Sequence, residues 1–312
     1  MIKSFTISVI PFLLFVFNAG FAQKHLELPS IGKEDEIVYH KGYTLSYNEK
    51  YEQANWVSYE LTREETDKSF ERTNKFLPDP LVHTGSATDA DYASSGYDRG
   101  HLAPAADMGW SQETMYESFY FSNMSPQTPS FNRGIWKHLE EMVREWAIEY
   151  DTLYIATGPV FEGDMPVIGP NKVAVPPFYY KAILTKSDGH YQAIGFILPN
   201  EASSANLSDF AVSVDSVENK THINFFAAME DAQEEKVEHN LCVSCWTWKK
   251  SKSHHTTKKT EPEHHANIVE QHIASTHASS GESVQCHGVT QKGTRCKKMT
   301  KDPSGYCNVH QK

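Results

Sequence analysis

The sequence predicts an α+β fold, because strand-like stretches and an amphipathic helix occur together in one region without low complexity. Four short stretches are predicted as strands: residues 57–61, 153–157, 179–184 and 191–198. The last three are rich in β-branched or aromatic residues and are closed by Gly, Asp or Pro. Helical periodicity is clearest after Asn132. One domain over about residues 34–248 accommodates all of these elements.

The composition narrows the class of protein. The chain has 312 residues, of which 39% are hydrophobic and 22% charged, so collagen-like, fully disordered and multi-span membrane proteins are excluded. The net charge of -11 argues against a uniformly basic protein that coats nucleic acid. The charge is unevenly distributed, with +6 from Lys249 onward and -17 before it.

Residues 1–22 have the pattern of a secretory signal peptide. A mostly apolar run over residues 5–17 is interrupted by Pro11 and is followed by small residues before a predicted cut near Gln23. The run is shorter than the roughly 20 residues that a membrane helix requires, so export is favoured over a membrane anchor. We expect a secreted or periplasmic protein without membrane insertion after the signal is removed.

The predicted helix after Asn132 carries polar groups beside its apolar stripe. Its large apolar residues recur at helical spacing: Ile135, Trp136, Leu139, Met142, Val143 and Trp146. Asn132 lies near the middle of this stripe and Glu140 within about 80° of it, so both oxygens can address one site from a single rigid helix. An amide oxygen with a carboxylate suits hydrated Mg²⁺. Taken alone, Asn132 is as well explained as a helix N-cap, and Glu140 as a solvated residue.

A second, shorter helix is expected over residues 207–214 or 214–220. Ahead of both helices, Arg99 and His101 stand on either side of Gly100. This arrangement puts a fixed cation beside the side chain that accepts a proton near neutral pH, which suits an anionic substrate. Alone, Arg99 is more often a surface ion-pair partner and His101 a turn histidine. The interpretation therefore depends on the two residues occurring together with the other motifs.

The stretch Asp98-Arg-Gly-His101, with its extension through Asp107, resembles the signature of the DNA/RNA non-specific endonucleases. Five further residues match the second block of that endonuclease G-like family: Asn123, Gln127, Asn132, Trp136 and Glu140. The resemblance covers about residues 43–226. It implies a ββα-metal (His-Me finger) core on a mainly antiparallel sheet, and Mg²⁺-dependent hydrolysis of phosphodiester bonds, with Mn²⁺ as a substitute. DNA and RNA are the implied substrates, with little sequence preference.

The resemblance also implies individual roles. His101 would be the general base that activates water, and Asn132 the only direct protein ligand of Mg²⁺. Glu140 would hydrogen-bond metal-bound water. Arg99 and Arg72 would contact the phosphate, with Arg63 as the alternative to Arg72.

Two residues of the second block, Asn123 and Gln127, are expected to bind substrate. Other functions stay open on the sequence alone: a relative that binds nucleic acid without catalysis, or a phosphodiesterase for small nucleotides or lipids. Neither the oligomeric state nor a preference between DNA and RNA follows from the sequence.

The C-terminal part differs in composition from the rest. Residues 249–283 are rich in Lys, Ser, Thr and His and predict a disordered linker. Residues 284–312 then supply four potential zinc ligands: Cys286, Cys296, Cys307 and His310. A Cys₃His zinc module is expected there, with a tail disulfide plus one free thiol, or no fixed structure, as alternatives. The remaining cysteines, Cys242 and Cys245, are spaced for a local disulfide.

Overall fold

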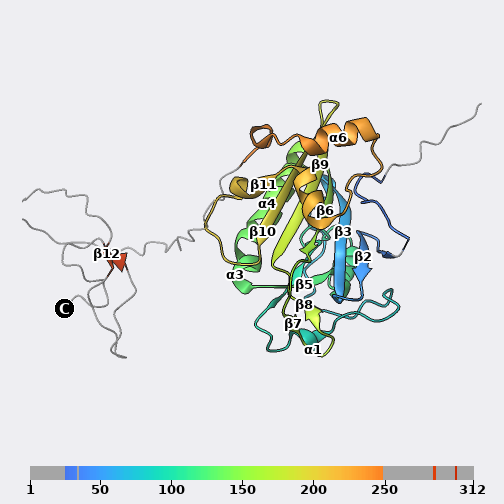
Figure 1. Ribbon diagram of the computed structural model, residues 1–312, viewed down its shortest axis with the longest axis vertical. Helices are drawn as coiled ribbons and strands as arrows, with labels where there is room; N and C mark the ends of the chain where they lie inside the picture. The colour runs from blue at the N-terminus through green and yellow to red at the C-terminus, as the bar shows by residue number, and fades with distance from the viewer. Residues whose placement is uncertain (1–24, 34, 249–283, 286–298, 301–312) are drawn as a thin grey trace, which may run out of the picture. The chain divides into compact units, whose positions relative to one another are not determined.

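A computed structural model of the chain describes residues 25–33, 35–248, 284–285 and 299–300 (Figure 1). The chain divides into two units, residues 1–253 and 254–312. In the second unit, the described residues are β12 (Val284–Gln285) and β13 (Met299–Thr300), which pair antiparallel. The predicted signal peptide, the linker and the tail residues Cys286, Cys296, Cys307 and His310 lie outside the described residues.

A seven-stranded sheet forms the centre of the first unit (Figure 1). All neighbouring strands pair antiparallel, in the order β1-β2-β3-β6-β9-β10-β11. The strands are β1 (Glu36–Tyr39), β2 (Thr44–Asn48), β3 (Gln53–Thr62), β6 (Thr152–Val160), β9 (Phe178–Ser187), β10 (His190–Pro199) and β11 (Ala211–Val212). The predicted α+β class and its four strands are confirmed. The strands extend beyond the predicted stretches because ladder pairing continues through flanking polar residues that apolar patterning does not mark.

The two faces of the sheet bury separate apolar cores. Alternate residues of β9 serve opposite faces, as the period of two in a strand requires. Tyr179 and Ile183 pack in the core that includes Leu139 and Val143 of α4 (Lys137–Tyr150). Tyr180 packs in the other core, on the side of α5 (Val214–Thr221) and α6 (Asp231–His239). The sheet therefore separates an α4 side from an α5/α6 side.

The remaining elements are short. The helices are α1 (Asp89–Tyr92), α2 (Gln112–Glu117) and α3 (Pro129–Phe131), and the 3₁₀ turns are η1 (Glu64–Thr66), η2 (Phe121–Asn123), η4 (Leu207–Phe210) and η5 (Val243–Cys245). A two-stranded ladder joins β7 (Val167–Ile168) to β8 (Val173–Ala174). Of the two ranges predicted for the second helix, the one that starts at residue 214 is confirmed by α5, while residues 207–210 form only a 3₁₀ turn.

The stretch that carries the predicted motifs folds as two strands followed by a helix. Strand β4 (Asp98–His101) pairs antiparallel with β5 (Met124–Gln127), and the chain continues into α4. The predicted start of the helix is wrong, because residues Asn132–Trp136 form a π-helical turn, η3, in which Gly134 is non-helical (φ -105°, ψ -114°). Asn132 and Glu140 therefore do not share one rigid helix. Apolar spacing could not reveal the break, because Ile135 and Trp136 are buried here as they would be in a continuous helix.

The end of the first unit packs back onto α4. Cys242 and Cys245 form a disulfide, as their spacing predicts. Trp246 follows at 4.6 Å from Trp146 between ring centroids, and the Trp146 indole N–H donates to the carbonyl of Thr247 at 2.7 Å. This segment thus packs against Trp146 in the same apolar core that α4 contacts. Among the described residues, no helix is both long and apolar enough to cross a bilayer.

Candidate active site

His101 ends strand β4 with a buried imidazole that is 8% exposed. Its Nε2 has no hydrogen-bond partner among the described residues. The ring lies between Phe119, at 4.9 Å in an edge-on arrangement, and Phe76, at 5.9 Å. Burial, with the nearby Arg72 cation, lowers the pKa of His101 to about 3. The imidazole is therefore neutral at physiological pH and can accept a proton at an unpaired nitrogen.

Two arginines lie against the same aromatic rings. The Arg99 guanidinium carbon is 4.3 Å from the centroid of Phe76. The Arg72 guanidinium carbon is 4.9 Å from the centroid of Phe119. Each ring that contacts His101 thus also holds a guanidinium by a cation–π contact. Because five donors of a guanidinium match phosphate oxygens, two of them beside a neutral imidazole suit a phosphodiester.

Both arginines keep part of their hydrogen-bonding capacity for a ligand. Arg99 forms an ion pair with Asp89, and Arg72 donates from Nε to the side-chain oxygen of Asn74 at 2.6 Å. The alternative Arg63 lies elsewhere, because its Nε donates to the carbonyl of Ile148 near the C-terminal end of α4. The structure thus brings Arg72, rather than Arg63, to His101.

Asn132 is fixed by the strand that carries His101. Its Nδ2 donates to Asp98 Oδ2 at 2.9 Å. Arg133 donates to both oxygens of the same carboxylate, from Nε at 2.8 Å and from Nη2 at 2.5 Å. Burial opposes ionisation of Asp98, but the hydrogen bonds from Arg133 and Asn132 prevail and hold its pKa below the ordinary value. The bond orients the amide so that Asn132 Oδ1 remains for a further partner.

Glu140 stands in the first turn of α4, half-buried among cations. Burial raises its pKa to about 7, against the opposing effects of Lys181, Arg144 and Arg72. The Arg72 cation lowers the pKa of both Glu140 and His101, so it lies near both groups. A carboxyl group with such a pKa changes its charge near neutral pH, and a nearby divalent cation would hold it ionised.

Lys181 is the principal counter-charge of Glu140. It extends from β9 on the α4 side of the sheet, since it alternates with Tyr180 and Ala182. Its ammonium group is fully buried, donates to Thr157 Oγ1 at 3.1 Å and lies 4.7 Å from a ring centroid of Trp136. Burial lowers its pKa to about 8, although Glu140 favours the charged form.

A second buried pair supports the same helix. Asp107, whose side chain is inaccessible to solvent, accepts from Arg144 Nη1 at 2.7 Å and from the Tyr59 hydroxyl at 2.8 Å. Burial works against the Arg144 cation, yet Asp107 and Glu140 raise its pKa above the ordinary value. The loop after His101 is thereby joined to α4 one turn beyond Glu140.

The sequence-based reasoning assigned no role to Lys181, Arg144 or Asp98. Arg144 follows Glu140 by four residues, so helical spacing alone would have placed the two side chains together. A lysine inside an otherwise apolar strand is the signal for Lys181. Asp98 belongs to the recognised motif, but its bond to Asn132 becomes visible only in three dimensions.

The two residues expected to bind substrate lie in the interior. Asn123 is fully buried, accepts from the Ala103 amide and donates to the carbonyls of Ala103 and Ser118, all at 2.9 Å. Gln127 is also fully buried and packs over Gly100, where an added Cβ would lie 2.2 Å from its side-chain carbon. Asn123 thus holds the backbone after His101 by hydrogen bonds, whereas Gln127 only packs against Gly100, which permits the close approach; Gln127 Nε2 and Oε1 have no hydrogen-bond partner among the described residues.

The available donors fit a hard divalent cation. Asn132 offers an amide oxygen, Glu140 a carboxylate and His101 an unpaired nitrogen. Oxygen ligands with room for several waters are what Mg²⁺ prefers.

Comparisons with known proteins identify the family of the chain. Residues 23–232 match the family model described as DNA/RNA non-specific endonuclease. Nuclease C1 of Cunninghamella echinulata var. echinulata is 35% identical over 222 residues, which are 66% of this chain and 88% of that protein. Mitochondrial endonuclease G of Homo sapiens is 36% identical over 200 residues, 59% of this chain and 67% of that protein.

A solved structure of the EndoG/EndoGI complex is similar, with a TM-score of 0.63 and 33% identity; the match covers 67% of this chain and 92% of that one. The family match spans well over half of the chain and includes the β4–β5–α4 stretch. The chain therefore belongs to the DNA/RNA non-specific endonuclease family and is a nuclease, a hydrolase that acts on DNA and RNA.

Proposed function

We propose that the chain is an exported, Mg²⁺-dependent endonuclease that cleaves DNA and RNA without sequence preference. The observation that carries the proposal is the buried, unpaired Nε2 of neutral His101, with Arg72 and Arg99 held on the two aromatic rings beside it. The export element rests on the signal-like pattern of residues 1–22.

In the proposed mechanism, His101 Nε2 takes the proton from the water that attacks phosphorus. The water oxygen forms a bond to phosphorus, and negative charge collects on the non-bridging oxygens. The bond from phosphorus to the leaving oxygen then breaks, and that oxygen keeps the electron pair and takes a proton from solvent water. Arg99 and Arg72 donate to these oxygens, and charge-assisted hydrogen bonds in a buried site favour the transition state more than the ground state. The low pKa of His101 keeps its imidazole neutral at physiological pH.

Asn132 Oδ1 would hold Mg²⁺ directly, and Glu140 would accept hydrogen bonds from water bound to the ion. When bound, Mg²⁺ supplies Lewis-acid stabilisation of the developing phosphate charge. Asp98 positions Asn132 by its hydrogen bond, and Lys181 and Arg144 favour the ionised state of Glu140. Mn²⁺ is expected to substitute, since it accepts the same oxygen ligands.

Asn123 and Gln127 act in this proposal as positioning residues. Asn123 ties the loop after His101 to the end of α2, and Gln127 fixes Gly100 between Arg99 and His101. The remaining substrate contacts in the proposal come from the guanidinium groups of Arg72 and Arg99. Contacts to phosphates do not distinguish one base sequence from another. This supports activity on both DNA and RNA.

For the C-terminal tail we propose a Zn²⁺ module formed by Cys286, Cys296, Cys307 and His310. The support is the ligand count and the small size of the segment, which needs a metal or disulfides to fold.

The decisive experiment incubates the mature chain from Gln23 with supercoiled plasmid, with RNA and with a small model diester, each in Mg²⁺ or in EDTA. We expect cleavage of plasmid and RNA in Mg²⁺ only, with the diester hydrolysed far more slowly. Plasmid binding without cleavage would identify a non-catalytic relative, and preferred hydrolysis of the diester a small-molecule phosphodiesterase. Either outcome overturns the proposal.

A metal titration tests the role of Asn132. Asn132→Ala should lower the rate by about 10²-fold or more and move half-maximal activity to higher Mg²⁺ concentration. The exposed Asn240, after α6, provides the control substitution Asn240→Ala. An unchanged Mg²⁺ titration in Asn132→Ala would remove this residue from the metal site.

A further inference from the structure

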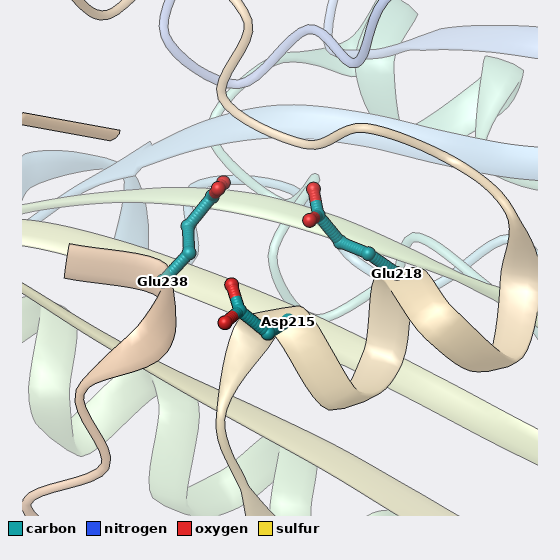
Figure 2. Close-up of side chains that lie close together, drawn as sticks. All are labelled: Asp215, Glu218 and Glu238. Atoms are coloured by element: carbon teal, nitrogen blue, oxygen red, sulfur yellow. The ribbon is translucent and has the colours of Figure 1, made fainter. Parts of the chain in front are cut away.

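Three acidic side chains converge on the α5/α6 side of the sheet, opposite α4. Asp215 and Glu218 project from successive turns of α5, and Glu238 projects from the last turn of α6. One carboxylate oxygen from each lies within 4.8 Å of the others. Figure 2 shows the three carboxylates directed into a common space between the two helices.

The Glu238 carboxylate distinguishes this cluster from an ordinary acidic surface. Glu238 is only 3% exposed, and its Oε1 is buried without a hydrogen-bond partner in the described part of the chain. Burial and the neighbouring Glu218, Glu234 and Asp215 together raise its pKa to about 9. A buried, unpaired carboxylate is unfavourable unless a positive charge compensates it.

The other two acids use part of their capacity within the protein. Asp215 Oδ2 contacts His239 Nδ1 at 2.9 Å, and Glu218 Oε1 accepts from the Phe225 amide at 2.7 Å. These bonds fix both side chains and leave the second oxygen of each for another ligand. The cluster therefore combines preset carboxylates with one buried acceptor that has no partner.

We propose that Asp215, Glu218 and Glu238 form a binding site for a hard divalent cation of the Ca²⁺ class. Since Ca²⁺ binds oxygens at about 2.3–2.6 Å, one ion can bridge oxygens up to about 5 Å apart. Ca²⁺ accepts irregular all-oxygen coordination, whereas Mg²⁺ requires near-octahedral geometry and retains its waters. The separation of the three side chains and their carboxylate chemistry match the former.

The site would join α6 to the rest of the domain. Helix α6 has one buried side chain, Glu238 itself, and Val237 packs only partly against the core. An ion held by both helices replaces repulsion among the acids with attraction. Its effect is therefore on stability, on the side of the sheet away from His101.

The test is thermal unfolding of the full mature chain with CaCl₂ as the only divalent salt, compared with EDTA. At about 100-fold excess of Ca²⁺ over its Kd, the wild type should gain roughly 5–10 °C in Tm. Glu238→Gln should lose this gain, and calorimetric titration should show one fewer Ca²⁺ site. The matched control Glu235→Gln lies exposed on the same helix and should keep the full shift.

The variants distinguish Ca²⁺ binding at this cluster from Ca²⁺ binding beside His101. Without a bound cation, Glu238 is protonated at neutral pH because its pKa is about 9, so Glu238→Gln exchanges one neutral group for another. In EDTA its Tm should therefore stay close to that of the wild type. Asp215→Asn is the second variant and should also lose the Ca²⁺ gain. The proposal is overturned if the wild type shows no Ca²⁺-induced shift, or if Glu238→Gln and Asp215→Asn both retain it.

Discussion

Two carboxyl groups on opposite sides of one sheet, the half-buried Glu140 and the buried Glu238, have contrasting surroundings. Glu140 on α4 is near Lys181, Arg144 and Arg72, and its pKa is raised only to about 7. Glu238 on α6 is near other acids, and its pKa is raised to about 9. Burial acts in the same direction at both positions, so the difference reflects the neighbouring charges. Glu140 is thus prepared for a change of charge near neutral pH, whereas Glu238 depends on compensation from outside the chain.

The largest expected loss of activity follows from substitution of His101, the proposed base near Arg72 and Arg99. His101→Ala should lower the rate of plasmid and RNA cleavage by about 10²–10⁴-fold, because it removes the unpaired imidazole nitrogen that is proposed to accept the proton from water. The control His138→Ala changes an exposed histidine of α4 and should leave the rate unchanged. Initial rates, with circular dichroism to verify folding, measure both. A wild-type rate in His101→Ala would refute the assignment.

A matched pair of substitutions tests the contrast directly. Glu140→Gln should lower kcat/KM by about 10–100-fold, as is usual for residues that orient the ligands of a metal. Glu238→Gln makes the same chemical change on the other face and should leave kcat/KM as in the wild type. Steady-state cleavage of an RNA substrate in Mg²⁺ provides the measurement. Equal losses in the two variants would mean that both carboxylates act through stability alone.

The smallest effect is a displacement of the pH profile. Removing the Lys181 cation should raise the pKa of Glu140 further, so in Lys181→Met the ionised carboxylate forms at higher pH. Activity should therefore fall most below pH 7 and recover at alkaline pH. His101 does not contribute to this limb, because its pKa is about 3. The exposed Lys186→Met on the same strand serves as control, and an unmoved acid limb would count against the charge coupling.

Local patterns predicted much of this fold. Alternating and periodic apolar residues predicted the central strands and the body of α4, since burial on one face imposes those periods. The break at Gly134 was not predictable in this way, because Phe131 before it and Ile135 after it are both buried, as in an unbroken helix. Asn132, beside the break, is held by a contact distant in sequence, its hydrogen bond to Asp98.

Prediction of the site was limited by the same kind of long-range contact. The motif around His101 predicted a base beside an arginine, but the location of Arg72 depends on its packing against Phe119, which local spacing does not encode. The resemblance suggested that Asn123 touches substrate, whereas its amide is fully engaged with backbone groups. Which of several polar residues faces outward is decided by tertiary packing.

The alternation along β9 has a consequence for how this protein can diversify. Lys181 belongs to one side of the strand and Tyr180 to the other. Neighbouring residues therefore serve the proposed active site on one side and the stability of the core on the other. Substitutions at the β9 positions that face α5 and α6 can alter thermal stability, or its dependence on salt, without moving the residues on the α4 side. Relatives that inhabit different environments could thus differ on the α5/α6 side and still cut nucleic acid in the same manner.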